Sequence, residues 1–108
     1  MNDQKILAEN YLDDQGRPAG GHVHGVGLSI EWQNGPLGRD AERLEPNGAF
    51  VETVLRAALQ RIEHYQAGQF RCRENALAIT KIEEALLWLG SRTARRETAG
   101  VEGTHGGN

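Results

Sequence analysis

Two segments in the second half of the chain place apolar residues on one face of a helix. Between positions 49 and 67, and again between positions 72 and 99, the stripe recurs at intervals of four and three residues. This spacing is typical of an amphipathic α-helix, and a connection of about four residues after Gly68 predicts an antiparallel helical hairpin. The first stripe contains Val51, Leu55, Ala58, Ile62 and Tyr65, flanked by Phe50, Val54 and Leu59, and the second contains Asn75, Ile79, Ile82, Leu86, Leu89 and Thr93, flanked by Ala78, Ala85 and Trp88.

The first half of the chain follows other patterns. Residues 3–14 predict a short helix that is stable only if it docks on another element. Residues 22–33 alternate between two faces, as a half-buried strand does, and Gly25 and Gly27 predict a bulge or a tight bend into a hairpin. Residues 33–48 are rich in glycine, proline and charge and predict a loop. One face of the predicted strand carries His22, His24, Val26, Leu28, Ile30 and Trp32.

Together these elements predict an α+β fold: a short N-terminal helix, a small antiparallel β-hairpin or sheet, and a long antiparallel helical hairpin. We expect residues 1–20 to form the helix and a linker, residues 21–101 to form the functional domain, and residues 102–108 to form a flexible glycine-rich tail. A chain of 108 residues buries a modest fraction of its surface. The seam of the helical hairpin carries more apolar surface than one hairpin can bury, so we expect at least a dimer.

Composition and charge narrow the possible functions. The net charge of −3 argues against a general nucleic-acid or membrane binder, because such proteins are usually basic. The single cysteine, Cys72, excludes an intrachain disulfide and does not support a cysteine-based zinc site. The sequence holds no long apolar run and no signal-peptide pattern, so we expect a soluble cytoplasmic protein.

The end of the second predicted helix offers one candidate site. Arg92 and Arg96 lie four residues apart, so they share a helix face and can present two guanidinium groups to a phosphate or pyrophosphate. The alternative is that they stabilise the helix C-terminus or pair with Glu97 and Glu102. Composition alone favours this alternative.

Asn75 and Tyr65 form a second candidate site. Asn75 lies on the apolar stripe, where a buried amide needs hydrogen-bond partners. It either fixes the register of an oligomer seam or presents its amide to a base or ribose. Tyr65 ends the stripe of the first helix, and the hairpin geometry places it near Asn75. A tyrosine at this place is more often part of a core or interface, but beside an asparagine it also suits a purine.

Other residue groups carry little chemistry. His22 and His24 share a strand face and offer two metal ligands, but no third ligand stands at a suitable spacing, so no metal site is expected. The glycine-rich residues 20–27 lack the lysine of a phosphate-binding loop, and no nucleophile stands beside a base. We therefore expect neither an enzyme nor a cofactor.

A distance argument connects the two candidate sites. Asn75 and Arg92 are 17 positions apart on one predicted helix, roughly 25 Å at about 1.5 Å per residue. No mononucleotide-sized ligand spans that distance. If both sites serve one pocket, two chains must supply it, and a two-fold pairing then creates two equal pockets.

Several stretches of the sequence resemble a known family. Small phage sponge proteins, which inhibit bacterial immune signalling, are similar to this chain in IEWQNGPLGRDAERLEPNGAFVE, HYQAGQFRCRENALAITKIEEALLWL and RTARRETAGVEGTH. The family includes anti-Thoeris proteins, which sequester glycocyclic ADP-ribose, and anti-CBASS proteins, which sequester cyclic oligonucleotides and share the hairpin domain. The resemblance covers residues 30–105 and implies a homodimer, or a hexamer built as a trimer of dimers, that binds cyclic nucleotides without turnover.

The resemblance also implies roles for individual residues. Pockets of the ADP-ribose type, shared between two subunits, are implied at Tyr65, Asn75, Arg92 and Arg96. Separate pockets for cyclic trinucleotides, where three subunits meet, are implied at Arg73 together with a loop arginine, either Arg43 or Arg39.

Two other functions stay open. One is a structural phage or prophage oligomer that has no small-molecule ligand and keeps its arginines in ion pairs. The other is a hydrolase that degrades the messenger, although no catalytic base stands near the arginines. Beyond cyclic nucleotides and further copies of the chain, we expect no nucleic-acid polymer and no membrane as a partner.

Overall fold

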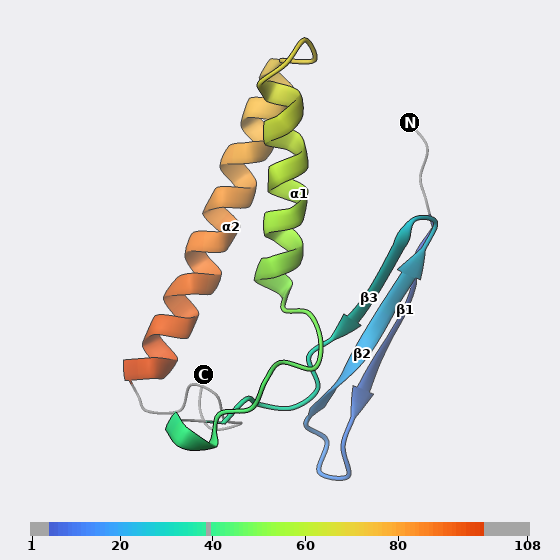
Figure 1. The fold of residues 1–108 in the computed structure, drawn as a ribbon, viewed down its shortest axis with the longest axis vertical. Coiled ribbons are helices and arrows are strands. Elements are labelled where there is room, and N and C mark those ends of the chain that lie inside the picture. Colours follow the sequence, from blue (N-terminus) through green and yellow to red (C-terminus); the bar gives the residue numbers. More distant parts are fainter. Residues whose placement is uncertain (1–4, 39, 99–108) are drawn as a thin grey trace. The chain divides into compact units, whose positions relative to one another are not determined.

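The computed structural model describes residues 5–38 and 40–98, and the chain divides into two compact units (Figure 1). The sheet unit contains the described residues up to Phe50, and the helical unit begins at Val51. The described residues form three strands in the first unit and two long helices in the second. The α+β class expected from the sequence is therefore confirmed.

The sheet unit is an antiparallel sheet whose strands follow chain order. β1 spans Leu7–Leu12, β2 spans Pro18–Gly25 and β3 spans Leu28–Trp32. β2 lies between the other two strands and pairs with both (Figure 1).

The N-terminal segment is a strand, so the helix predicted over residues 3–14 is wrong. Asn10 pairs with Gly21, so the backbone groups of β1 find their partners in β2 instead of along a helix. Gly21 permits this close pairing, because a Cβ at that position would collide with the carbonyl oxygen of Glu9. The predicted linker, which ends at residue 20, therefore contains the first residues of β2, the strand that pairs with β1.

A tight turn joins β1 to β2, and the carboxylate of Asp13 organises it. Its Oδ1 accepts the backbone N–H groups of Gln15 at 2.8 Å and of Arg17 at 2.9 Å, and its Oδ2 accepts the Arg17 guanidinium at 2.9 Å. The backbone N–H of Arg17 is the main reason that the pKa of Asp13 lies below its usual value. The ionised carboxylate therefore holds the turn together.

The bend predicted at Gly25 and Gly27 is confirmed. Gly25 pairs with Leu28, so only Val26 and Gly27 connect β2 to β3. Gly27 has a φ of 73°, which is a backbone conformation that favours glycine. The stretch predicted as one strand is thus two antiparallel strands joined by a two-residue turn.

This turn changes which side chains share a face of the sheet. Cross-strand partners share a face, and His22 pairs with Glu31 while Val23 pairs with Ile30. The predicted face that joined the histidines to Ile30 is therefore wrong, because the turn sets the even positions of β2 opposite the odd positions of β3. The sheet has a polar face with Glu9, Tyr11, His22, His24 and Glu31, and an apolar face with Ala8, Val23, Ile30 and Trp32.

The loop after β3 returns to the sheet before the first helix begins. The N–H of Ala49 donates to the carbonyl of Glu31 at 2.7 Å, and its carbonyl accepts the N–H of Gln33 at 3.0 Å. The side chain of Asn47 exchanges hydrogen bonds of 2.8 and 3.0 Å with the backbone of Asn34. These contacts fasten the two ends of the loop to each other.

The helical unit is the antiparallel hairpin that the sequence predicts. α1 spans Val51–Gln66 and α2 spans Arg73–Thr98, and the two helices run side by side (Figure 1). The stripe predicted for α2 is confirmed, because every member is half-buried: Asn75, Ile79, Ile82, Leu86, Leu89 and Thr93.

The stripe of α1 is confirmed only in part. Leu55 and Ile62 are half-buried as expected, as are the flanking Val54 and Leu59. The other predicted members are exposed: Val51, Ala58 and Tyr65. Trp88 of α2, which the helical period placed beside the seam, is 71% exposed. The hairpin contact is therefore narrower than the sequence indicates.

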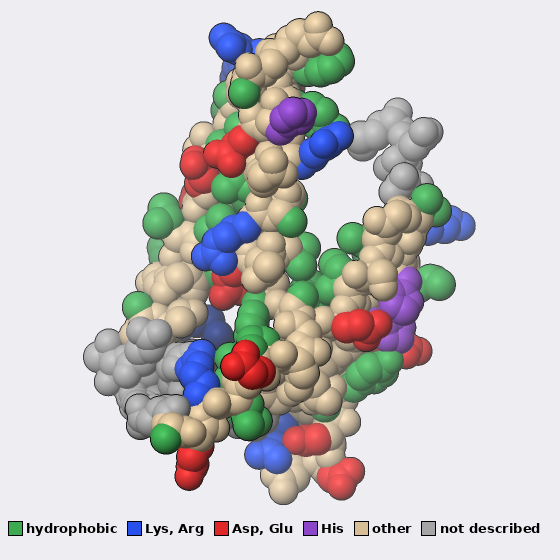
Figure 2. Space-filling model, in the orientation of Figure 1, with side chains coloured by type: hydrophobic (Ala, Val, Ile, Leu, Met, Phe, Trp, Pro, Cys, Tyr) green, Lys and Arg blue, Asp and Glu red, His purple; other side chains and the backbone are tan. Residues whose placement is uncertain are grey.

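Little of the described chain is fully buried. Leu37, in the loop after β3, is the one hydrophobic side chain of the described residues that is buried, and a short 3₁₀ turn at Asp40–Glu42 follows it. α1 has no fully buried residue. Figure 2 shows apolar side chains reaching the surface between charged ones, and the most exposed on α2 are Leu77, Leu87 and Trp88.

Candidate functional site

Side-chain hydrogen bonds hold the connection between the two helices. Gln66, the last residue of α1, accepts the N–H of Cys72 on its side-chain oxygen and donates to the Cys72 carbonyl, each at 3.0 Å. The Sγ of Cys72 accepts the N–H of Asn75 at 3.4 Å and so satisfies a donor in the first turn of α2. The start of α2 is thereby fixed relative to the end of α1.

Two of the predicted site residues meet at this connection. The side-chain N–H of Asn75 donates to the carbonyl of Phe70 at 3.1 Å, and the ring of Phe70 lies at 87° to that of Tyr65 with centroids 6.3 Å apart. Asn75 is half-buried, and Tyr65 is 36% exposed. The side-chain oxygen of Asn75 accepts no hydrogen bond from the described residues. An accessible aromatic ring and an amide acceptor therefore lie close together.

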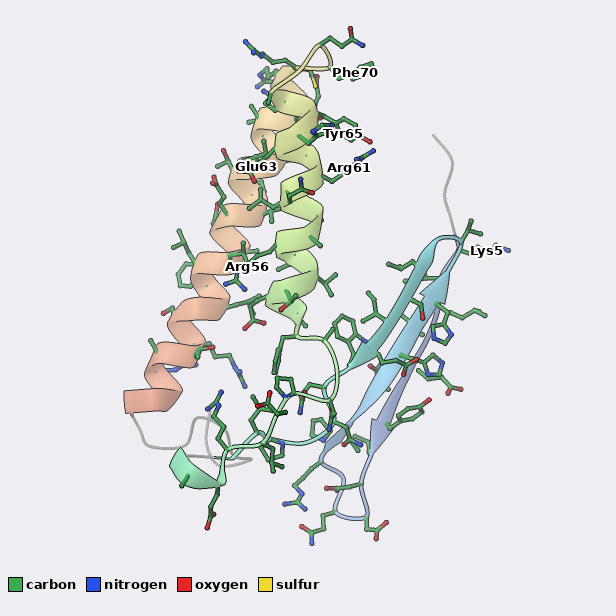
Figure 3. All side chains as sticks on the ribbon, viewed as in Figure 1. Lys5, Arg56, Arg61, Glu63, Tyr65 and Phe70 are labelled. Atoms are coloured by element: carbon green, nitrogen blue, oxygen red, sulfur yellow. The ribbon has the colours of Figure 1, made fainter. Side chains whose placement is uncertain are left out.

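Arg61 belongs to the same group of side chains, and sequence reasoning missed it. Its Nε donates to the hydroxyl of Tyr65 at 3.0 Å, and its guanidinium carbon lies 4.8 Å from the centre of the ring. Figure 3 shows both side chains projecting from the same side of α1, with Phe70 in the connection beyond them. Arg61 and Tyr65 are four residues apart on one helix, and this spacing could have indicated their contact. Phe70 lies in the connection, outside any periodic pattern. We call Arg61, Tyr65, Phe70 and Asn75 the loop-end cluster.

The predicted phosphate-binding arginines lie at the other end of α2. Arg92 is exposed and makes no ion pair or hydrogen bond with a described residue. Arg96 lies in α2, but its side chain is outside the described residues, as are those of its two predicted carboxylate partners. Because α2 is one continuous helix, the 17 positions from Asn75 to Arg92 correspond to roughly 25 Å. A single chain keeps the loop-end cluster and Arg92 apart.

The arginines predicted for a second kind of pocket lie in both units. Arg73 is the exposed first residue of α2, close in sequence to the loop-end cluster. Arg43 is exposed in the loop of the sheet unit, and Arg39 lies outside the described residues. That Arg73 and a loop arginine bind the same cyclic trinucleotide stays a prediction.

The polar face of the sheet carries a separate group of titratable side chains. The rings of His22 and His24 stack with centroids 4.6 Å apart. The hydroxyl of Tyr11 lies 2.7 Å from Nδ1 of His22, and Nε2 of His24 lies 3.2 Å from a carboxylate oxygen of Glu31. Desolvation, followed by the negative charge of Glu9, raises the pKa of Tyr11. The described residues contain no group of three His, Cys, Asp or Glu side chains that could hold a metal ion.

Comparison with known proteins identifies the family of this hairpin. The family model described as Acb2/Tad1, hairpin domain, matches residues 26–94, which include β3, the loop, α1 and most of α2. The chain belongs to the Acb2/Tad1 hairpin-domain family. The matched Acb2/Tad1 region contains the whole loop-end cluster and Arg92, whereas β1 and β2 precede it. The family resemblance seen in the sequence is thus confirmed.

A curated relative extends the comparison. The protein named Thoeris anti-defense 1, from Bacillus phage SBSphiJ7, is 46% identical to this chain over 77 residues, which are 71% of this chain and 51% of the relative. The chain therefore spans about half the length of the curated relative it matches. In residues 5–38 and 40–98, neither helix has the length and apolar character needed to cross a membrane.

Proposed function

We propose that this protein binds and sequesters cyclic nucleotide messengers of bacterial anti-phage defence, in the first place glycocyclic ADP-ribose. Membership of the Acb2/Tad1 hairpin-domain family supports this proposal, as does the name of the phage relative, Thoeris anti-defense 1. The protein acts in the cytoplasm of the bacterial host. It lowers the free concentration of the messenger and releases it unchanged.

Two copies of the hairpin build each pocket for glycocyclic ADP-ribose. In one copy, Tyr65 stacks on the adenine and the amide of Asn75 bonds a sugar or base edge. The other copy supplies Arg92 and Arg96, whose guanidinium groups bind the pyrophosphate through charge-assisted hydrogen bonds. The observation that carries this arrangement is the continuity of α2, which separates the two groups of residues within one chain.

The exposed apolar surface of the helical unit supports an assembly of at least two copies. The seam side chains are only half-buried in one chain, and Leu87 and Trp88 are 73% and 71% exposed. Burying such surface is favourable, and a small domain gains from it more than a large one. A two-fold dimer has two equal pockets, and three dimers complete a hexamer.

The hexamer offers separate pockets for cyclic trinucleotides. Arg73 supplies charge at the start of α2, and a loop arginine, Arg43 or Arg39, supplies a second cation. Both are expected to contact phosphates of the ring. Arg73 lies two positions before Asn75, about 200° around α2, so the two side chains project from different sides of the helix and the two classes of messenger need not share one site.

Sequestration is tested by binding and recovery. We expect the purified protein to bind glycocyclic ADP-ribose in calorimetry, with one site per chain. Its unfolding temperature should rise with the logarithm of the free ligand concentration once that concentration exceeds Kd. Heat denaturation should then release the messenger with unchanged mass. A hydrolase would release a heavier, opened product, and a purely structural oligomer would show no shift in unfolding temperature.

A further inference from the structure

Arg61 differs from the ion-paired cations of the described chain, because its partner is an aromatic side chain. Arg17 pairs with Asp13, and Lys81 pairs with Glu84 at 3.7 Å. Arg61 has no carboxylate partner among the described residues, and its hydrogen bond and its ring contact both go to Tyr65. Glu63 lies two positions further along α1, about 200° around the helix, and Figure 3 shows it on the opposite side from Arg61.

The contact between Arg61 and Tyr65 can be replaced by a contact with a ligand. Both side chains are exposed, so their cation–π contact is weak and is open to competition from other partners. Arginine has a long flexible stem and a planar group that stacks on flat rings. Phe70, which is 65% exposed, flanks the Tyr65 ring at a right angle and limits the ways in which that ring can turn.

The observed spacing leaves no room for a base between the two groups. The guanidinium carbon lies 4.8 Å from the ring centre. A base with a partner on each face needs about 7 Å between those partners, because carbon atoms in contact are about 3.5 Å apart. A base that stacks on this face of Tyr65 must therefore displace Arg61 from it.

We propose that Arg61 is the movable cover of the base-binding face of the loop-end cluster. On binding, its guanidinium leaves the hydroxyl of Tyr65 and closes on the outer face of the adenine, which then lies between Tyr65 and Arg61. Phe70 is a positioning residue that holds the Tyr65 ring from the side. This role rests on the sequestration proposed above and adds a residue on α1 that recognises the base by stacking.

The test compares three variants in calorimetric titrations with glycocyclic ADP-ribose. Arg61→Ala removes the cover and should weaken binding about tenfold, which corresponds to a well-formed cation–π contact. Arg61→Lys keeps the positive charge but lacks the planar guanidinium that stacks on a base, so it should also bind several-fold more weakly than the wild type. Arg56→Ala is the matched control: it removes an exposed arginine from α1, and Arg56 lines a shallow depression beside Glu83, Leu86 and Leu87. It should bind as the wild type does.

A spectroscopic readout separates stacking from a general loss of charge. Stacking between two planes lowers the ultraviolet absorbance of adenine, and this decrease should be smaller in Arg61→Ala than in the wild type at full saturation. Circular dichroism should show the same helix content in all variants, because Arg61 is exposed.

Each outcome decides the matter. If the wild type binds and Arg61→Ala binds equally well or more tightly, the cover is refuted and sequestration stands. If Arg61→Lys keeps full affinity, charge alone suffices and stacking is refuted. If the wild type does not bind, both proposals fail.

Discussion

The two units of this protein reach their structures by different means. In the helical unit, the 3.6-residue period of the apolar stripes fixes two long helices, and the Gln66 side chain then clamps the connection to Cys72. The sheet unit depends instead on local contacts. Gly21 permits close pairing of β1 and β2, and the Asp13 carboxylate accepts hydrogen bonds from backbone N–H groups of the turn. The residues that we propose for glycocyclic ADP-ribose binding therefore sit on the unit whose structure is the more predictable from sequence.

The largest expected effect comes from the seam of the helical unit. Ile82→Asp places a charge at a half-buried position of α2, which should cost about 3 kcal/mol or more and dissociate or unfold the assembly. Thr80→Asp is the matched control, because Thr80 is an exposed residue of the same helix. Native mass spectrometry and thermal unfolding measure both variants. A wild type that is a stable monomer at micromolar concentration would contradict the proposed assembly.

A smaller and selective effect is expected at the start of α2. Arg73→Ala removes a charged contact worth about 1.5 to 3 kcal/mol, so cyclic trinucleotide binding should fall at least tenfold. Glycocyclic ADP-ribose binding should be unchanged, because Arg73 projects from a different side of α2 than Asn75, two positions further along the helix. Titration of each ligand into Arg73→Ala and into the control Arg95→Ala gives the comparison. Equal losses of both ligands in Arg73→Ala would show that the two pockets are not independent.

The smallest expected effect lies in the sheet unit. The folded-state pKa of Asp13 is lowered, so its ionised form stabilises the turn at pH values above the unfolded pKa of about 4, and this contribution is lost as the pH falls through the folded pKa. Asp13→Asn should remove that part of the acid sensitivity and leave binding at neutral pH unchanged. Hydrogen exchange of the β1 and β2 amides as a function of pH measures the acid sensitivity, and calorimetry measures ligand binding at neutral pH. The prediction fails if both proteins lose protection identically on acidification.

The fold was predictable from sequence only where the apolar period dominates. The α2 stripe, from Asn75 to Thr93, was correct at every member because one helix face packs on its neighbour. The N-terminal strand was missed because its partner, β2, begins with a glycine-rich stretch, and glycines usually indicate a loop. Here Gly21 lets the β1 backbone approach closely because it has no side chain. The face of the histidines was misassigned because a turn of two residues rather than one strand follows Gly25.

The candidate site was predictable in part for a related reason. Tyr65 and Asn75 lie at the ends of two helical stripes, so the hairpin brings both to the same connection, where Phe70 touches each of them. Phe70 itself lies in a loop whose course depends on the Gln66 clamp, which no sequence period encodes. Arg61 lies outside the apolar stripes, and only its hydrogen bond to Tyr65 distinguishes it from other surface cations.

The central claim is that two chains share each pocket, and a mixing experiment tests it most directly. Asn75→Ala and Arg92→Ala should each abolish glycocyclic ADP-ribose binding when pure. After the two variants are unfolded, mixed and refolded, about half of the dimers carry one chain of each kind, and in these both lesions fall in one pocket and leave the other whole. Calorimetry should then recover roughly a quarter of the wild-type number of sites. If mass spectrometry confirms mixed dimers and the mixture binds no better than either parent, each pocket lies within one chain and the account is wrong.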